Sequence, residues 1–234
     1  MKNIFSSLKS VFRREGFFKS LFIIPLRLLQ YYYYKTFKRR EFQLRGKSHP
    51  YFYHLRNATF LKERMIEIPI AIDLFKEYGG KRILEVGNVM YQYYPTVHDV
   101  VDKYEAGAGV LNEDIIDYNP GKKYDLIVTI STMEHVGWDE TPREKDKFIK
   151  ALNHLKELLA PGGILFVSIP VGYSDDVDLA LAEKRIPLSE IYFMKKVTRD
   201  NKWDVVPYEQ VKDSRCDMKY LRANALLLGF HQAK

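Results

Sequence analysis

Residues 81–90 read KRILEVGNVM, and this stretch decides the fold of the chain. Two basic residues lead into a short apolar run that ends at Gly87, a pattern typical of a buried strand in a parallel sheet. Glu85 lies within the run, two residues before the glycine. The glycine lets the backbone approach a ligand closely, and the acid can accept hydrogen bonds. The stretch therefore predicts the first strand of an α/β sheet, with a nucleotide-type pocket at its carboxyl end.

Two later segments extend this predicted pocket. Residues 98–104, HDVVDKY, predict a second strand with Asp102 near its end. An acid at that place can accept hydrogen bonds from both ribose hydroxyls of an adenosine-type ligand. Further on, Asp114 is followed by the apolar Ile115. This pair suits an adenine site, in which the carboxylate accepts from the exocyclic amine and Ile115 lies against the ring.

The next segments predict a strand, a helix and another strand. Residues 124–130, YDLIVTI, form a strongly apolar run that continues into the polar residues 131–137, at the end of the strand where open α/β sheets bind ligands. Residues 141–144, TPRE, match a capping box with proline at the first helical position, so we expect a helix to start there. Pro-Gly-Gly at 161–163 ends it, and residues 164–170, ILFVSIP, predict a buried strand reached by a right-handed crossover.

The segments on either side of this unit carry weaker signals. The apolar spacing within residues 56–78 predicts a helix in front of the first strand, kinked or restarted at Pro69 and ended by two glycines. Residues 175–178, DDVD, fit a solvated acidic turn better than a metal site, and we predict no metal site elsewhere. Residues 175–187 form an insertion before the last strands.

Charge and cysteine content limit the classes of protein. The chain of 234 residues is 46% hydrophobic, which is enough for one α/β domain with an extension. Its single cysteine excludes an internal disulfide and a thiolate metal cluster, which favours a reducing, cytoplasmic location. Residues 1–47 hold 12 Lys or Arg and 2 Glu, or +10, so that residues 48–234 carry −3 of the net +7. We therefore divide the chain into a basic arm, residues 1–50, and a domain, residues 51–234.

The arm interleaves cations with aromatic and aliphatic residues. Its most apolar part, residues 17–34, contains Lys19, Pro25 and Arg27, and so falls short of a membrane-spanning helix. A basic segment rich in aromatic residues suits the plane of an anionic membrane surface, at the inner face of the membrane for a cytoplasmic protein. The alternative is an arm that packs on its own domain or on a partner subunit. We do not predict nucleic-acid binding, because the arm carries more aliphatic bulk than a groove for phosphates needs.

Taken together, residues 83–172 resemble a class I S-adenosylmethionine-dependent methyltransferase. The resemblance rests on LEVG, on EDI before a turn, on YDLIVTISTMEHVG, and on LKELLAPGGILFVSIP. It implies a Rossmann-like, seven-stranded, mostly parallel sheet with helices on both faces and a C-terminal antiparallel hairpin, here residues 190–198 and 225–232. It also implies S-adenosylmethionine as the cofactor. The candidate cofactor-binding residues are Glu85, Gly87, Asn88, Asp102, Asp114, Ile115 and Ser131.

One departure from the family pattern concerns the glycine loop. The family has roughly G-x-G-x-G after its first strand, whereas Val89 and Tyr91 replace the second and third glycines in this chain. Side chains at these positions crowd the methionine part of the cofactor unless the loop takes another path. The short segment after Asn88 favours such a remodelled loop.

His135 and Glu134 are the candidate catalytic residues. A methyl transfer to a hydroxyl group needs removal of a proton, and histidine is the natural base near neutral pH. Alternatively, the pair holds a metal ion or a small anion, as in some related enzymes, or His135 caps a turn. The sequence thus predicts O-methylation of a small-molecule, glycan or lipid-linked acceptor near a membrane. A catalytically inactive methyltransferase fold used for binding is the second hypothesis. An NAD-dependent enzyme is disfavoured, because G-x-G-x-x-G is missing.

Overall fold

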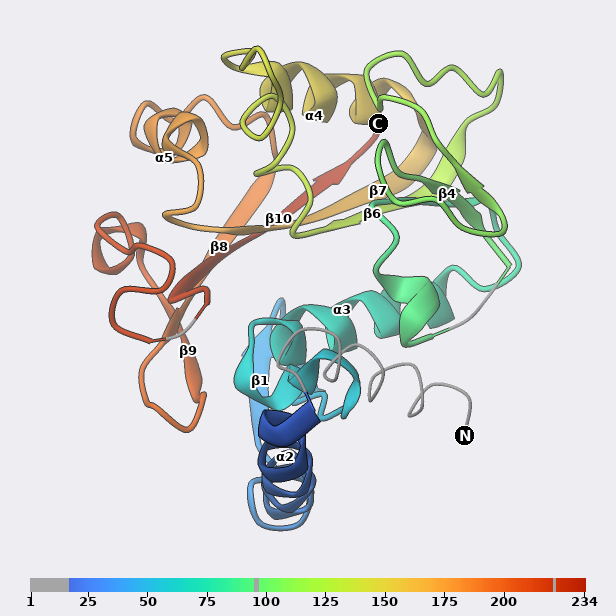
Figure 1. Ribbon diagram of the computed structural model, residues 1–234. Helices are drawn as coiled ribbons and strands as arrows, with labels where there is room; N and C mark the ends of the chain where they lie inside the picture. Colours follow the sequence, from blue (N-terminus) through green and yellow to red (C-terminus); the bar gives the residue numbers. More distant parts are fainter. Residues whose placement is uncertain (1–16, 95–96, 221) are drawn as a thin grey trace.

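The computed structural model describes residues 17–94, 97–220 and 222–234, and its centre is an eight-stranded sheet of order β5-β4-β3-β6-β7-β10-β8-β9 (Figure 1). Strands β5, β4, β3, β6 and β7 are parallel, whereas β10 runs antiparallel to both of its neighbours and β9 antiparallel to β8. The strands are β3 Ile83–Val86, β4 Asp99–Val101, β5 Val110–Leu111, β6 Tyr124–Ile130, β7 Leu159–Pro170, β8 Glu190–Lys196, β9 Trp203–Val206 and β10 Ala225–Gln232. The predicted Rossmann-like sheet is confirmed, with β9 as one strand beyond the expected seven.

Helices cover both faces of this sheet. Alternate strand residues point to opposite faces, so Leu84 and Ile127 pack in one apolar cluster with α4, and Ile83 and Leu126 in another with α3. In Figure 1, α4 and α5 lie above the sheet and α3 below it. The helices are α2 Phe17–Phe37, α3 Arg64–Glu77, α4 Lys147–Glu157 and α5 Asp175–Ala182, with short 3-10 turns at η1 Arg56–Leu61, η2 Met90–Gln92 and η3 Tyr208–Gln210.

Helix α3 starts later than its sequence pattern indicates. We expected it from residue 56, but Asn57 and Ala58 have positive φ angles of 54° and 46°, which breaks the helical path. The helix also does not restart at Pro69, because it continues through this residue. Proline cannot donate to the carbonyl four residues earlier, and the carbonyl of Met65 accepts instead from the backbone N–H of Phe52 (3.0 Å).

Two further predictions of local structure need correction. Helix α4 starts at Lys147 and not at the capping box of residues 141–144, because Asp146 has a φ of 58° and ends a loop that folds back on Gly137. There the backbone N–H of Glu144 donates to the carbonyl of Gly137 (3.0 Å). The acid-rich residues 175–178 are the first turn of α5 and not a solvated turn. Acidic side chains are stabilising at that end of a helix.

The described part of the arm packs on the domain from Tyr31 onward. The Tyr34 ring lies 5.5 Å from that of Phe60, and the hairpin of β1 Glu41–Leu44 and β2 Lys47–Pro50 places Phe42 and Leu44 in the α3 cluster. Arg40 pairs with Asp200 (2.5 Å). Most of α2, in contrast, exposes large apolar side chains. None of the helices among residues 17–94, 97–220 and 222–234 is long and apolar enough to cross a membrane. Residues 1–16 of the arm lie outside the described residues.

Candidate functional site

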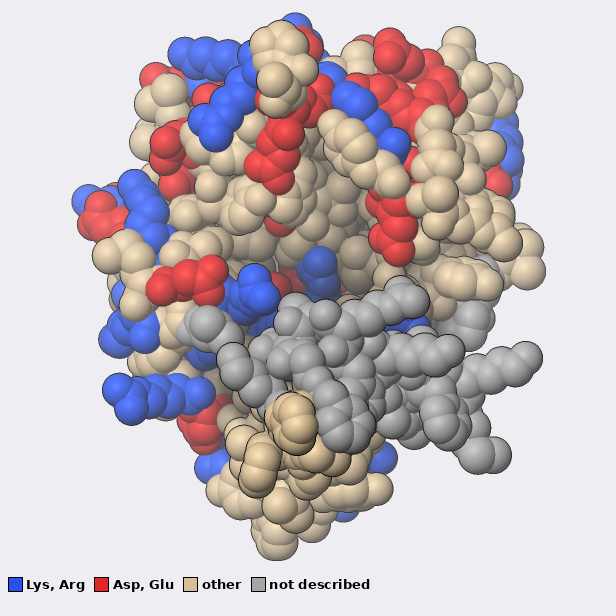
Figure 2. Space-filling view, in the orientation of Figure 1, with Lys and Arg blue, Asp and Glu red and all other residues tan. Residues whose placement is uncertain are grey.

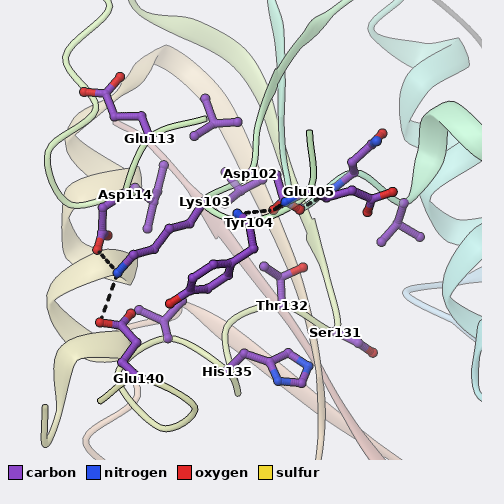
Figure 3. Close-up of a pocket in the computed structure, with 17 residues that line it drawn as sticks. Asp102, Lys103, Tyr104, Glu105, Glu113, Asp114, Ser131, Thr132, His135 and Glu140 are labelled. Atoms are coloured by element: carbon purple, nitrogen blue, oxygen red, sulfur yellow. Dashed lines mark hydrogen bonds and ion pairs between the residues drawn. The ribbon is translucent and has the colours of Figure 1, made fainter. Parts of the chain in front are cut away.

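A cavity of about 250 Å³ lies at the carboxyl ends of β3, β4 and β6 (Figure 3). The loops that follow these strands line it. Seven of the nine predicted site residues are among its lining: Gly87, Asn88, Asp102, Asp114, Ile115, Ser131 and His135. Glu85 and Glu134 are not among them. The sequence therefore located the pocket, but Glu85 and Glu134 are buried and do not line it.

The loop after β3 takes a path that accommodates the missing glycines. Gly87 has a φ of 85°, and a Cβ atom there would lie 2.2 Å from the hydroxyl oxygen of Thr132, so this position requires glycine. The N–H of Val89 then donates to the carbonyl of Gly87 (2.9 Å), which closes a tight turn. Met90 is fully buried, and Tyr91, which is 53% exposed, is not among the residues that line the cavity, whereas Val89 is.

Glu85 holds this loop from beneath. Its carboxylate is 1% exposed and accepts from the backbone N–H groups of Val89 (2.6 Å) and Met90 (2.5 Å). The second carboxylate oxygen lies 2.7 Å from Nε2 of His98. Because all of these partners belong to the protein, the geometry gives Glu85 a positioning role. Its place in the sequence could not distinguish that role from ligand binding.

Backbone N–H groups use most of the hydrogen-bonding capacity of the Asp102 carboxylate. The carboxylate of the neighbouring Glu105 has no hydrogen-bond partner among the described residues. The carboxylate of Asp102 accepts from the backbone N–H groups of Asn88 (3.1 Å), Tyr104 (2.9 Å) and Glu105 (2.7 Å). Two carboxylate oxygens offer about four lone-pair sites, so about one remains. The side chain of Glu105 lines the cavity, and burial and the charge of Asp102 raise its pKa. Sequence reasoning missed Glu105, although an acid three residues after Asp102 was a usable signal.

The far end of the cavity is closed by an ion-pair network. Asp114 pairs with Lys103 (2.8 Å) and Lys147 (2.6 Å), and both lysines also contact Glu140 (3.1 and 2.7 Å). Figure 3 shows the Lys103 side chain reaching across the cavity to these acids. Burial acts to raise the pKa of Asp114, but hydrogen bonds from the two lysines outweigh it and bring the pKa to about 2. Ile115 is buried in the wall beside this network.

His135 belongs to a chain of three polar side chains at the open side of the cavity. Its Nδ1 atom lies 2.5 Å from Asp139, which also accepts from the hydroxyl of Tyr173 (2.8 Å). The ring of Tyr173 packs edge-on against the imidazole, with centroids 4.7 Å apart. Burial acts to raise the pKa of Asp139, but the hydrogen bonds from His135 and Tyr173 lower it overall. An ionised Asp139 fixes the proton of His135 on Nδ1 and leaves Nε2 free to accept.

Glu134 is a buried acid behind this group. It is 2% exposed, its Oε2 atom has no hydrogen-bond partner among the described residues, and its Oε1 atom lies 3.7 Å from Nε2 of His135. Burial, followed by the charges of Glu67 and Glu63, raises its pKa well above the usual range.

Ser131 is tied to the helix in front of the sheet. Its hydroxyl and that of Ser168 both donate to Oε1 of the fully buried Glu67 (2.6 and 2.7 Å), and Arg64 pairs with the other oxygen of Glu67 (2.5 Å). Ser131 also has a φ of 40°, so this network holds a backbone conformation that few residues adopt. The carboxyl ends of β6 and β7 are therefore fixed to α3.

The strand order, with parallel strands around β3 and the reversed β10 between β7 and β8, is the Rossmann-like fold of the class I methyltransferases. No family model and no curated protein matches the chain. Among solved structures it is similar to the N-methyltransferase NodS from Bradyrhizobium japonicum in complex with S-adenosyl-L-homocysteine, at 15% identity over 73% of this chain and 91% of that one, with a TM-score of 0.41. It is also similar to a SAM-dependent methyltransferase from Thermotoga maritima, at 15% identity over 72% of this chain and 89% of that one, with a TM-score of 0.44. These values concern the fold alone.

Proposed function

We propose that the chain is an S-adenosylmethionine-dependent methyltransferase. The observation that carries this proposal is a cavity at the carboxyl ends of β3, β4 and β6 that offers acceptors suited to an adenosine-type ligand. Asn88 is buried in its wall with an amide oxygen that lacks a partner among the described residues, and Glu105 is a carboxylate without a fixed partner there. These polar groups fit the cofactor, because a ligand rich in donors would satisfy them.

Each part of the cofactor has a candidate partner in this cavity. Glu105 and the remaining lone pair of Asp102 would accept hydrogen bonds from the ribose hydroxyls. Asp114 would accept a hydrogen bond from the adenine amine, and Ile115 would lie against the adenine ring. The backbone of Gly87 and Asn88 would approach the methionine part, since a side chain at residue 87 has no room. When bound, the cofactor supplies a methyl group on a sulfonium centre.

We propose a hydroxyl group of a small molecule, glycan or lipid-linked compound as the methyl acceptor. The His135–Asp139 pair supports this, because a histidine oriented through Nδ1 can take the proton of a hydroxyl at Nε2. Ionised Asp139 then stabilises the resulting imidazolium. Tyr173, two residues before the 175–187 insertion, positions Asp139 from the acceptor side.

The test is calorimetry of the full chain with S-adenosylmethionine and S-adenosylhomocysteine, followed by transfer of a labelled methyl group to hydroxyl-bearing acceptors. We expect saturable binding of both ligands with one site per chain. Absence of binding would overturn the proposal and leave the fold as a binding scaffold. Binding without transfer to any hydroxyl acceptor, but with transfer to amines, would keep the methyltransferase and reject the hydroxyl.

We also propose that the protein acts at the inner, anionic surface of a membrane and contacts it through the arm. Along α2, Phe22, Leu26, Leu29, Tyr33 and Phe37 form one stripe at helical spacing, and each is 48% exposed or more. Residues 17–40 hold six cations and no acid, although Lys38 and Arg40 already pair with Asp200. In Figure 2 the visible lower end of the molecule, where α2 lies, is mostly tan, with Lys and Arg at its margins. An apolar stripe beside excess positive charge suits an anionic lipid surface.

A further inference from the structure

A second cavity lies apart from the candidate active site, between the end of β8 and the loop after η3. Its volume is about 550 Å³. Asn224 gives it a fixed wall, because its buried side-chain amide donates to the carbonyls of Arg215, Tyr220 and Arg222 (2.9, 3.0 and 3.2 Å). The hydroxyl of Tyr220 in turn donates to the carbonyl of Val197 (3.0 Å). The loop is thus built around the cavity by hydrogen bonds.

Cations outnumber acids in the lining of this cavity. Four basic residues, Lys195, Lys196, Arg215 and Lys219, face two acids, Glu209 and Asp213. Glu209 already pairs with Lys212 (2.7 Å), and Arg215 with Asp178 (3.2 Å), both outside the cavity lining. Three lysines therefore remain against the single acid Asp213. Figure 2 shows this side of the molecule, on the left, to be rich in Lys and Arg.

Lys196 is the unusual member of this group. It is 5% exposed, yet no carboxylate of the described residues lies within 4.0 Å of its ammonium group, which instead lies 5.3 Å from the centroid of the Tyr220 ring. The ammonium of Lys219 lies at the same distance from that ring. Burial of an ammonium group without a counter-ion is unfavourable. Consistently, burial lowers the pKa of Lys196, and the charge of Glu63 offsets only part of the effect.

We propose that this cavity binds an oxyanion of the phosphate or sulfate type, with Lys196 as its central contact and Lys219 at its rim. Such a group would supply the counter-ion that Lys196 lacks and would neutralise the excess of positive charge. The oxyanion has two sources, a free anion or a phosphate carried by a larger molecule. Glu63 acts electrostatically on both Lys196 and Glu134.

The test measures thermal unfolding of the full chain in increasing inorganic phosphate, against sodium chloride of equal ionic strength. A ligand that binds only the folded state raises the midpoint with its concentration. For wild type we expect the midpoint to rise saturably with phosphate. For Lys196→Met we expect the dissociation constant for phosphate to increase about tenfold or more, because a bond to a charged group is lost. For Lys150→Met, which replaces an exposed lysine on α4, we expect this constant to be unchanged. Equal responses to phosphate and chloride, or an unchanged constant in Lys196→Met, would overturn the proposal.

Two additions keep the test decisive. Lys219 is exposed, so Lys219→Met probes the same cavity without disturbing the core, and we expect it to weaken phosphate binding several-fold even if Lys196→Met fails to fold. Glucose 6-phosphate distinguishes the sources, because tighter binding than inorganic phosphate indicates a phosphate on a larger molecule and equal binding a free anion. Calorimetry with S-adenosylmethionine should give wild-type affinity for both variants, so failure here is separable from failure of the proposed function.

Discussion

The two acids beside His135 differ in what they can contribute. Asp139 lies 2.5 Å from Nδ1 and orients the ring, whereas Glu134 lies beyond hydrogen-bond distance of Nε2, at 3.7 Å. A base must reach its proton at about 2.6–3.2 Å. In the proposed reaction, the acceptor hydroxyl would lie beside Nε2, and Asp139 would be a positioning residue.

Replacement of Asp139 should separate positioning from binding. We expect His135→Ala to reduce kcat by about 10²–10⁴, and Asp139→Asn to reduce it by a smaller factor and to change the pH dependence of kcat. Both should leave the affinity for S-adenosylmethionine within about twofold of wild type. Steady-state kinetics across pH and calorimetry check this. A normal pH profile in Asp139→Asn would contradict the positioning role, and Tyr173→Phe is the control that removes only the outer hydrogen bond.

Asp102 and Glu105 provide a second contrast between neighbouring acids. Glu105→Gln should weaken binding of S-adenosylmethionine by about 1.5–3 kcal/mol, the range for hydrogen bonds to a charged group, with little effect on the unfolding midpoint. Asp102→Asn should lower the midpoint as well, because its carboxylate accepts three backbone N–H bonds. Calorimetry and thermal unfolding of the two variants check this. Weaker binding in Asp102→Asn with an unchanged midpoint would assign the ribose to Asp102 instead.

Glu134 should reduce stability at neutral pH. Burial places its folded-state pKa above the usual 4.5, so the folded chain binds the extra proton and stability falls as pH rises from about 4.5 toward the folded pKa. Glutamine has the same shape and no charge. We therefore expect Glu134→Gln to be more stable than wild type at pH 7.5, by about 2–4 °C in Tm for each kcal/mol, and the difference to vanish toward pH 4. A constant difference across this range would contradict the assignment.

At the scale of elements, the buried central strands were predictable, whereas the edge strand β9 and the starts of helices were not. The boundary between α4 and β7 also differs from the prediction: the helix ends at Glu157, and Pro-Gly-Gly at 161–163 lies inside β7, which starts at Leu159. Residues 124–130 and 225–232 coincide with β6 and β10, because buried strands are continuous apolar runs with clear ends. Helices α3 and α4 start later than predicted, since Asn57, Ala58 and Asp146 adopt left-handed backbone conformations that no local pattern signals. In the candidate site, the sequence located seven of the lining residues. The sequence could not show which acids accept hydrogen bonds from backbone N–H groups, because those hydrogen bonds depend on how the loops pack.

The loop in front of α4 offers a test with a matched control. Gly137 and Gly80 have the same φ of 79°, but a Cβ atom at residue 137 would lie 2.4 Å from the carbonyl oxygen of Glu144, whereas nothing lies within 4 Å at residue 80. We expect Gly80→Ala to cost about 1 kcal/mol for the left-handed conformation, and Gly137→Ala about 1–3 kcal/mol more for the clash. Urea unfolding measures both. Equal costs would show that the loop moves freely.

At the scale of the whole molecule, the charge division predicts how the protein meets a membrane. Full-length protein should sediment with anionic vesicles, less with neutral ones, and binding should weaken in high salt without vanishing, because the apolar contribution of α2 is not screened. Phe22→Ser, Leu26→Ser and Leu29→Ser together should weaken binding at least tenfold, since burial of each side chain contributes about 1.5–3 kcal/mol.

The control for this experiment removes exposed apolar residues elsewhere. Val97, Leu179 and Val205 are 101%, 40% and 47% exposed outside the arm, and their combined replacement by serine should leave vesicle binding unchanged. Equal losses in the two triple variants would exclude α2 as the contact. Substitution is preferable to deletion of residues 1–47, because Phe42 and Leu44 lie in the core and their loss would disturb folding.

The position of β10 also bears on how the chain folds as it is synthesised. β7 and β8 leave the ribosome first, but neither pairs with the other, because the later β10 lies between them. Until residues 225–232 have been made, the nascent sheet is therefore two separate pieces, each with an open edge that can pair with a neighbouring chain. Completion of the sheet, and with it the support under the ends of β6 and β7, is a late event in the life of each molecule.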